Sequence, residues 1–217
     1  MNVLIYGAGV LGVQVYHLIH EIPEFNISGF IDDTKKIGES IFPDLKVTEN
    51  RETLEKKLSK EPQFTKDYGL ILAIGPDNLA ARWKVFQWGL EKGFHFPNLI
   101  HPRASVGASA SLGKGNIILA NATIDHEVSI GDANYLDIGC LVSHNGNIGN
   151  NNFLTTGCAT AGNVKFGNHN FVGMHSTFTD YVEVGDENYF SAKNLVNRNV
   201  PDRRKILTFI DQKSLPI

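Results

Sequence analysis

The chain has 217 residues, 42% of them hydrophobic, and a formal net charge of -3, which is typical of a globular protein of one or two domains. It lacks the basic surplus of proteins that bind nucleic acid. The N-terminus runs directly into a strand pattern without the features of a secretory signal, and no apolar run approaches membrane-spanning length. We therefore expect a cytoplasmic protein with neither nucleic acid nor a membrane as partner.

The N-terminal segment combines a short apolar strand, residues 2–6, with a glycine-rich turn and an amphipathic helix that runs to about Ile22. The turn has the pattern G-x-G-x-x-G, and in this strand-turn-helix context the glycines allow a phosphate to approach the helix N-terminus. A second strand, residues 27–31, ends in two carboxylates where a ribose hydroxyl is usually held. The candidate nucleotide-binding residues are Gly7, Ala8, Gly9, Gly12, Asp32 and Asp33.

The size of this region argues against a dinucleotide site. About 95 residues precede the repeats described below, whereas a full dinucleotide fold needs two βαβαβ halves. Residues 68–74 form a predicted buried parallel strand closed by Gly75, a further candidate substrate-binding residue, and residues 79–92 form a predicted helix, which completes one half. One half-fold holds one nucleotide, although its turn can also be purely structural. An NAD-dependent oxidoreductase is a further alternative, but the glycine motif and Asp32 are the only residues that support it.

From Val106 to Val196 an apolar residue recurs at every sixth position, and Thr160 is the one polar exception in sixteen steps. A period of six fits short parallel strands joined by tight corners, the hexapeptide form of the β-helix. The string G-x-x-N recurs every eighteen residues, with glycines at positions 113, 131, 149, 167 and 185. Three hexads therefore make one triangular coil. Glycine and asparagine adopt positive φ angles easily, and stacked asparagines can hydrogen-bond from coil to coil.

The fold prediction is an α/β Rossmann-like half-fold at residues 1–98, an all-β prism of coils at 99–201 and a C-terminal tail at 202–217. Residues eighteen apart lie above one another, separated by roughly 4.8 Å. Cys140 and Cys158 share a column and are expected to be reduced thiols. By the same spacing His126, His144 and Gly162 form one column, and Glu127, Asn145 and Asn163 form the neighbouring column.

A nucleotide-binding half-fold joined by an NLIHP-like linker to a hexapeptide prism resembles the bacterial sugar acetyltransferases of the sialic acid O-acetyltransferase and UDP-4-amino-sugar N-acetyltransferase family. The resemblance covers residues 2 to about 201. It is carried by GAGVLG, GFIDD, LAIG, FPNLIHP and IGNNNFLTTGCATAGNVKFGNHNFVG. It implies a left-handed parallel β-helix, acetyl-CoA as acyl donor, a UDP-sugar as acceptor and no metal.

In that family a histidine on the prism acts as general base, and a glycine in the next coil offers its backbone N–H to the thioester carbonyl. The family frame assigns these roles to His144 and Gly162. The column argument independently places Gly162 one coil above His144. His126, one coil earlier, is the alternative base. Imidazole suits the task because its unperturbed pKa lies near neutrality.

Several positions depart from the family pattern. Asn145 replaces the acid that directly follows the histidine; its amide oxygen can fix the tautomer but supplies no charge, for which Glu127 is the candidate. Phe153 stands where many members carry a histidine near the acceptor sugar. Asn163 and Gly173 are, with Gly162, the candidate residues for binding the donor acetyl-CoA. The loop that lines the CoA pantetheine in the family is replaced by residues 207–217.

We therefore predict an acetyl-CoA-dependent acetyltransferase that acts on an amino group or hydroxyl of a nucleotide-linked sugar, in bacterial surface polysaccharide or glycan biosynthesis. The alternative is a non-catalytic sugar-nucleotide-binding relative with a lost or altered acyl-CoA site. A homotrimer is expected, because a prism has flat faces and no internal pocket, so that acceptor and CoA need a neighbour's wall. The sugar, and the choice between N- and O-acetylation, stay open.

Overall fold

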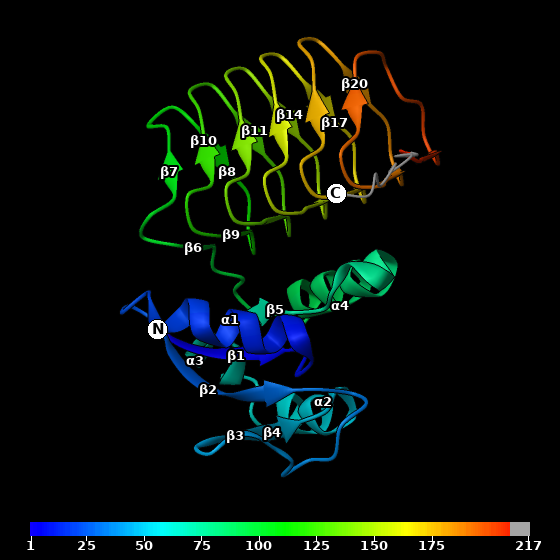
Figure 1. Ribbon diagram of the computed structural model, residues 1–217. Coiled ribbons are helices and arrows are strands. Elements are labelled where there is room, and N and C mark those ends of the chain that lie inside the picture. Colours follow the sequence, from blue (N-terminus) through cyan, green and yellow to red (C-terminus); the bar gives the residue numbers. More distant parts are fainter. Residues whose placement is uncertain (209–217) are drawn as a thin grey trace, which may run out of the picture.

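The computed structural model describes residues 1–208, and Figure 1 shows an α/β unit lying beside a prism of stacked coils. The α/β unit consists of β1 (Asn2–Tyr6), α1 (Val10–His20), β2 (Asn26–Ile31), β3 (Ser40–Phe42), β4 (Leu45–Glu49), α2 (Arg51–Lys60), α3 (Phe64–Asp67), β5 (Tyr68–Leu72), η1 (Pro76–Asn78) and α4 (Leu79–Glu91). Its sheet has the order β3-β4-β2-β1-β5, with β3 antiparallel to β4 and the other pairs parallel. Residues 209–217, the end of the predicted tail, lie outside the described residues.

Strand β1, which lies between β2 and β5, is buried on both faces of the sheet. Val3 and Ile5 pack with α1, while Leu4 and Tyr6 pack with α2 and α4, because successive side chains of a strand point to opposite faces. This explains why the segment is an uninterrupted apolar run. The predicted half-fold is confirmed. Within residues 1–208, no helix is long and apolar enough to cross a membrane.

The prism has three faces, each made of two-residue parallel strands. The uncharged face contains β7 (Ser105–Val106), β10 (Thr123–Ile124), β13 (Leu141–Val142), β16 (Ala159–Thr160), β19 (Thr177–Phe178) and β22 (Leu195–Val196). The polar face contains β8 (Ser111–Leu112), β11 (Ser129–Ile130), β14 (Asn147–Ile148), β17 (Lys165–Phe166) and β20 (Glu183–Val184). The aromatic face contains β6 (Leu99–Ile100), β9 (Ile117–Ile118), β12 (Tyr135–Leu136), β15 (Phe153–Leu154), β18 (Phe171–Val172), β21 (Tyr189–Phe190) and β23 (Lys205–Ile206).

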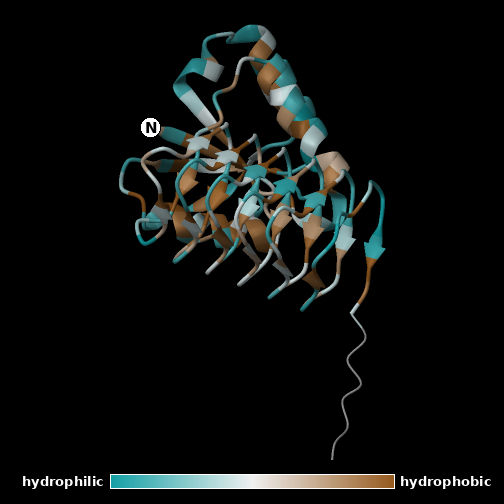
Figure 2. Cartoon of the chain, turned by 90° about the horizontal axis from the view of Figure 1, so that it is seen from above, coloured by the Kyte–Doolittle hydropathy of each residue, from teal (hydrophilic) through white to brown (hydrophobic). Residues whose placement is uncertain are grey.

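The six-residue period is the inward-facing position of every coil. The second residue of each strand from β9 to β22 lies in one apolar core with Cys140 and Cys158, which are free thiols, apart from Thr160, which is also buried. Strands eighteen residues apart pair in register, as Thr123 with Leu141 and Leu141 with Ala159. The β-helix prediction is therefore confirmed, and Figure 2 shows the hydrophobic and hydrophilic positions recurring from coil to coil.

The G-x-x-N corners work differently from the expectation. The positive φ angle falls on the third residue, for example +55° at Ala133 and +53° at Asn151, and not on the glycine or the final asparagine. The glycine is needed for space, because a Cβ on Gly131 would lie 2.8 Å from the carbonyl oxygen of Gly149 in the next coil. The asparagine serves the predicted ladder: Asn152 N–H donates to Asn134 Oδ1 at 2.8 Å.

The prism continues beyond Pro201, where we expected the pattern to stop. Strand β23 pairs with β21, matching Tyr189 with Lys205. Arg204 N–H donates to Asn188 Oδ1 at 2.7 Å, which extends the asparagine ladder. This pairing spans sixteen residues instead of eighteen, so a search for the eighteen-residue period does not reveal it.

The α/β unit packs against the aromatic face of the prism. Tyr135 and Phe153 belong to the same cluster as α1, and Arg82 of α4 is fully buried at the corner before that face. Its guanidinium donates to Ala133 O and, at 2.7 Å, to Asn151 Oδ1. The two parts of the chain are therefore joined by apolar contact and by a buried polar anchor.

Candidate functional site

The three glycines of the G-x-G-x-x-G turn have separate tasks. Gly7 has φ +113°, and a Cβ there would lie 2.4 Å from Ala73 O; a Cβ on Gly12 would lie 2.1 Å from Gly7 O. These two glycines allow the turn to close against the sheet and the helix. A Cβ on Gly9 would meet no atom within 4 Å, and Gly9 is the N-cap of α1 without any side-chain cap. Gly9 therefore presents an open helix N-terminus, the feature that attracts a phosphate.

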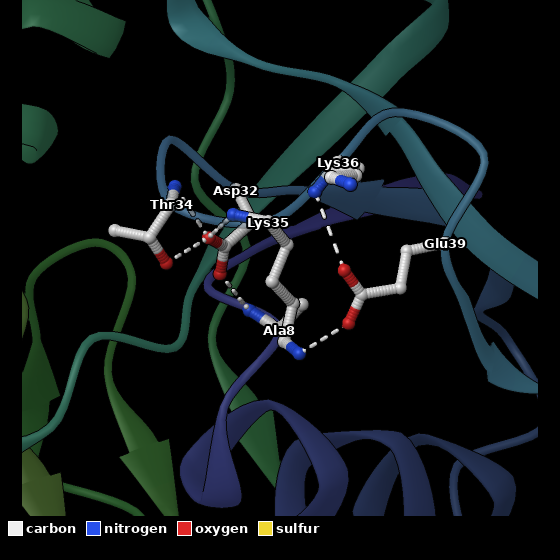
Figure 3. A network of polar contacts seen from close by, with 6 residues as sticks. All are labelled: Ala8, Asp32, Thr34, Lys35, Lys36 and Glu39. Atoms are coloured by element: carbon white, nitrogen blue, oxygen red, sulfur yellow. Dashed lines mark hydrogen bonds and ion pairs between the residues drawn. The ribbon is translucent and has the colours of Figure 1, made fainter.

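Asp32 stabilises this turn through hydrogen bonds. Its Oδ2 accepts the backbone N–H of Ala8 at 2.8 Å, and its Oδ1 accepts the backbone and hydroxyl of Thr34 and the backbone of Lys35, as Figure 3 shows. Burial of Asp32 opposes its ionisation, but these hydrogen bonds outweigh it, so the pKa of Asp32 lies below its ordinary value. We expected Asp32 and Ala8 to contact the nucleotide, but Oδ2 of Asp32 and the N–H of Ala8 are hydrogen-bonded to each other.

Asp33 is also engaged within the protein. Its Oδ2 accepts the hydroxyl of Tyr6 at 2.7 Å, and its Oδ1 accepts the backbone N–H of Arg51 at 2.8 Å. Each oxygen of Asp33 therefore has one protein donor, whereas Oδ1 of Asp32 has three. Asp33 is the carboxylate with more room for a ligand hydroxyl, because a carboxylate offers about four lone-pair positions.

A cavity of about 410 Å³ lies between the α/β unit and the aromatic face. Its walls bring together Gly9 from the glycine turn, Gly75 after β5, and Phe153 from the prism, three residues that were predicted separately as substrate-binding. Tyr135 on the cavity wall donates its hydroxyl to Gln14 Oε1 of α1 at 2.8 Å, so the prism and the helix are tied together at the cavity. Sequence reasoning missed Tyr135 and Gln14, because no repeat links residues so far apart.

The predicted column of His126, His144 and Gly162 runs through successive corners between the uncharged and the polar face. The His126 and His144 rings stack with centroids 5.5 Å apart and planes 15° apart. A Cβ on Gly162 would lie 2.4 Å from Cε1 of His144, so any larger residue at this position would force the ring to move. Nδ1 of His144 lies 3.0 Å from Oδ1 of Asn145. An amide oxygen accepts only, which assigns the proton to Nδ1 and leaves the Nε2 lone pair free.

The acid near these rings is not the expected one. Within residues 1–208, the Glu127 carboxylate makes no hydrogen bond or ion pair, and its backbone N–H is held by Ser109 Oγ at 3.0 Å. Asp125 contacts His126 instead, with Oδ1 2.8 Å from Nδ1 of the ring. The eighteen-residue spacing did not identify Asp125, because Asp125 directly precedes His126 and lies in a different column.

The donor-site candidates are divided between two corners. The Gly162 N–H donates to Asp180 Oδ1 at 3.0 Å, and the N–H of Asn163 is taken by His144 O. Gly173 lies at the corner between the aromatic and the uncharged face, where its N–H is taken by Phe190 O and a Cβ would lie 2.5 Å from Ala192 N. Gly173 is therefore a packing glycine. Asp180 was missed, although it follows Gly162 by eighteen residues.

His144 and the cavity lie on opposite sides of one prism. The catalytic corner joins the uncharged face to the polar face, whereas the α/β unit covers the third, aromatic face. In Figure 1 the corner between β13 and β14 lies among the loops on the side of the prism away from the α/β unit. The two halves of the predicted site therefore cannot meet within one chain.

The fold defines a hexapeptide β-helix protein with a Rossmann-like half-fold at its N-terminus. Residues 2–88 match the family model of the PglD N-terminal domain, and the whole chain has the fold of solved sugar acetyltransferases. A comparison with curated proteins finds no match to the sequence.

Solved structures are similar along nearly the whole chain. The acetyltransferase domain of PglB from Neisseria gonorrhoeae has a TM-score of 0.86 and 23% identity, over 95% of this chain and 96% of that one. PerB from Caulobacter crescentus, in complex with CoA and GDP-perosamine, has a TM-score of 0.84 and 25% identity, over 96% of this chain and 94% of that one.

Proposed function

We propose that the protein transfers an acetyl group from acetyl-CoA to an amino group or hydroxyl of a nucleotide-linked sugar. The observation that carries the proposal is the position of the His144 ring beside Gly162, where a Cβ would lie 2.6 Å from Nε2 of the ring, which places a base next to a backbone N–H that can bind the thioester carbonyl. Two structural relatives support it, the PglB domain in complex with acetyl-CoA and PerB with CoA and GDP-perosamine.

The chemistry follows from the groups at the corner. Nε2 of His144 takes the proton of the acceptor amine or hydroxyl as that atom attacks the thioester carbonyl. The Gly162 N–H receives the developing oxyanion in place of Asp180. The tetrahedral intermediate collapses by breaking the carbon–sulfur bond, and the leaving sulfur takes the proton from the imidazolium. His144 is then neutral again, and the products are CoA and the acetylated sugar.

The acceptor binds in the cavity at Gly9, Gly75 and Phe153, with its phosphates at the N-terminus of α1. The nucleoside reaches Asp33, and a UDP-sugar is the acceptor we favour. The setting is cytoplasmic glycan or surface polysaccharide biosynthesis, where nucleotide-linked sugars are used.

A cyclic homotrimer completes the site. The outward residues of the uncharged face are Ser105, Thr123, Leu141, Ala159, Thr177 and Leu195, none of which carries a charge. Leu195 is 69% exposed and Leu141 40% exposed, which is the composition of a surface that a second copy can cover. A heterologous contact through this face would bring the His144 corner of one copy to the cavity of the next.

The test is a CoA-release screen with acetyl-CoA and a panel of nucleotide-linked amino sugars. The wild-type enzyme should turn over at least one acceptor, and His144→Ala should lose roughly a hundredfold to ten-thousandfold in kcat. His126→Ala is the matched control and should lose far less. Full activity of His144→Ala would transfer the role of base to His126.

A second candidate, a non-catalytic sugar-nucleotide-binding relative, is favoured by two observations. Asn145 replaces the family's acid, and Asp180 occupies the N–H that the thioester needs. Calorimetry with acetyl-CoA separates the two candidates, because a protein that binds UDP-sugar but not acetyl-CoA is a binding relative.

A further inference from the structure

The second histidine of the catalytic column has a firmly held carboxylate partner. Oδ1 of Asp125 accepts the backbone N–H of His126 at 2.7 Å and lies 2.8 Å from Nδ1 of the same ring. The ring in turn stacks on His144. Asp125 is therefore fixed beside a pair of parallel imidazoles, one of which is the proposed base.

Three carboxylates belong to the column of His144 or to the columns beside it, namely Asp180, Asp125 and Glu127. Glu127 makes no side-chain hydrogen bond or ion pair within residues 1–208, so nothing holds it near the ring. Asp180, above the ring, is bonded to the Gly162 N–H and must release it for the thioester. The adjacent Asn145 is neutral. Asp125 is held by His126, the second titratable ring of the column, and its hydrogen bonds leave the Gly162 N–H free.

Asp125 is ionised at neutral pH. The backbone and ring hydrogen bonds from His126, together with the proximity of His144, hold the pKa of Asp125 below its ordinary value. Its side chain is 43% exposed and that of His126 61% exposed, so solvent and salt screen its field in a single chain.

We infer that Asp125, held by His126, is the positioning residue that stabilises the imidazolium formed on His144, in place of the acid that Asn145 replaces. The inference rests on the proposed function, in which the acceptor's proton moves to Nε2 of His144 and then to the sulfur of CoA. Asp125 and His126 exchange no proton in this sequence. Their contribution is electrostatic and exists only while His144 is charged.

The direction of the expected effect follows from the negative charge of Asp125. A negative charge nearby stabilises the protonated ring, so its removal makes His144 lose its proton at lower pH and weakens the stabilisation of the transition state. Asp125→Asn keeps the shape of the side chain and removes the charge. We expect kcat to fall about threefold to tenfold, with both KM values retained, since the interaction matters only once the imidazolium forms.

The experiment compares Asp125→Asn with the matched control Glu127→Gln. The acid limb of the pH dependence of kcat should move to lower pH by a few tenths of a unit in Asp125→Asn, and high salt should narrow the difference from wild type. Glu127→Gln should behave as wild type. An Asp125→Asn profile that superimposes on wild type, or a shift in Glu127→Gln alone, would overturn the inference.

A readout without turnover separates this inference from the proposed function. The Cε1 proton of His144, assigned by its loss in His144→Ala, is titrated by NMR in wild type and in Asp125→Asn. The midpoint should be lower in the variant. An unchanged midpoint refutes the role of Asp125, whereas the absence of acetyl transfer by wild type with a shifted midpoint refutes only the proposed function.

Discussion

At the scale of single residues, a carboxylate is bonded to the N–H that we propose binds the thioester oxygen. Asp180 is exposed and accepts the Gly162 N–H at 3.0 Å, so acetyl-CoA has to displace it. Asp180→Ala should therefore lower the KM for acetyl-CoA by about twofold to tenfold, the value of one exposed hydrogen bond, with the acceptor KM unchanged.

Steady-state kinetics with varied acetyl-CoA measure this effect. Asp186→Ala is the control, because Asp186 accepts the N–H of Asn168 in the same way at another corner. An increase in the KM for acetyl-CoA in Asp180→Ala would instead show that Asp180 helps to bind the donor.

The glycine turn offers a second test at this scale. Gly9→Ala places a methyl group in open space, so the melting temperature should stay at the wild-type value while the acceptor KM rises about tenfold or more, because the methyl group keeps the phosphate from the backbone. Gly12→Ala forces a Cβ to 2.1 Å from Gly7 O and should lower the melting temperature. Thermal unfolding measures the melting temperature, and kinetics with varied acceptor measure the acceptor KM. Equal effects of the two variants on stability would contradict the division of roles.

At the scale of elements, the buried asparagine ladder holds the two-residue strands together. Asn152 is fully buried, donates to Asn134 Oδ1 and Gly167 O, and accepts from Asn170 N–H. Asn152→Ala leaves these partners unsatisfied inside the prism and should reduce the free energy of unfolding by about 2–4 kcal/mol.

Urea unfolding followed by circular dichroism measures this loss. Asn147→Ala, at an exposed position of the polar face, is the control and should stay within about 0.5 kcal/mol of wild type. A loss in Asn152→Ala as small as that of the control would mean that strand pairing alone carries the prism.

At the scale of the whole molecule, the separation of His144 from the cavity predicts that active sites are shared. His144→Ala removes the base and Gly9→Val blocks the cavity, so each variant alone should be inactive. In the proposed trimer, co-expression of both variants mixes the chains at random, so that about a quarter of the sites combine an intact base with the intact cavity of the neighbour. CoA release by the co-purified mixture should therefore recover to about a quarter of the wild-type rate, whereas a site confined to one chain would show no recovery.

Much of this architecture was predictable, because it depends on regular spacing along the chain. A residue six positions on returns to the same side of the prism wall, and one eighteen positions on lies above it. The inward positions from Val106 to Val196 and the stacking of His126, His144 and Gly162 follow from this arithmetic. The glycine turn was equally visible, because a strand, a turn and a helix are contiguous in sequence.

The tertiary structure decided which polar groups are already paired and which surfaces meet. Asp32 accepts the N–H of Ala8, Asp125 and not Glu127 is bonded to His126, and Asp180 accepts the N–H of Gly162. The spacing does not predict these pairs, because a side chain's partner depends on its rotamer and on neighbours brought close through space. The docking of Arg82 at Asn151 and the sixteen-residue last coil likewise have no periodic signal. Periodicity determines where a residue stands in this prism, and only the packing of the α/β unit against one of its three faces determines what that residue can touch.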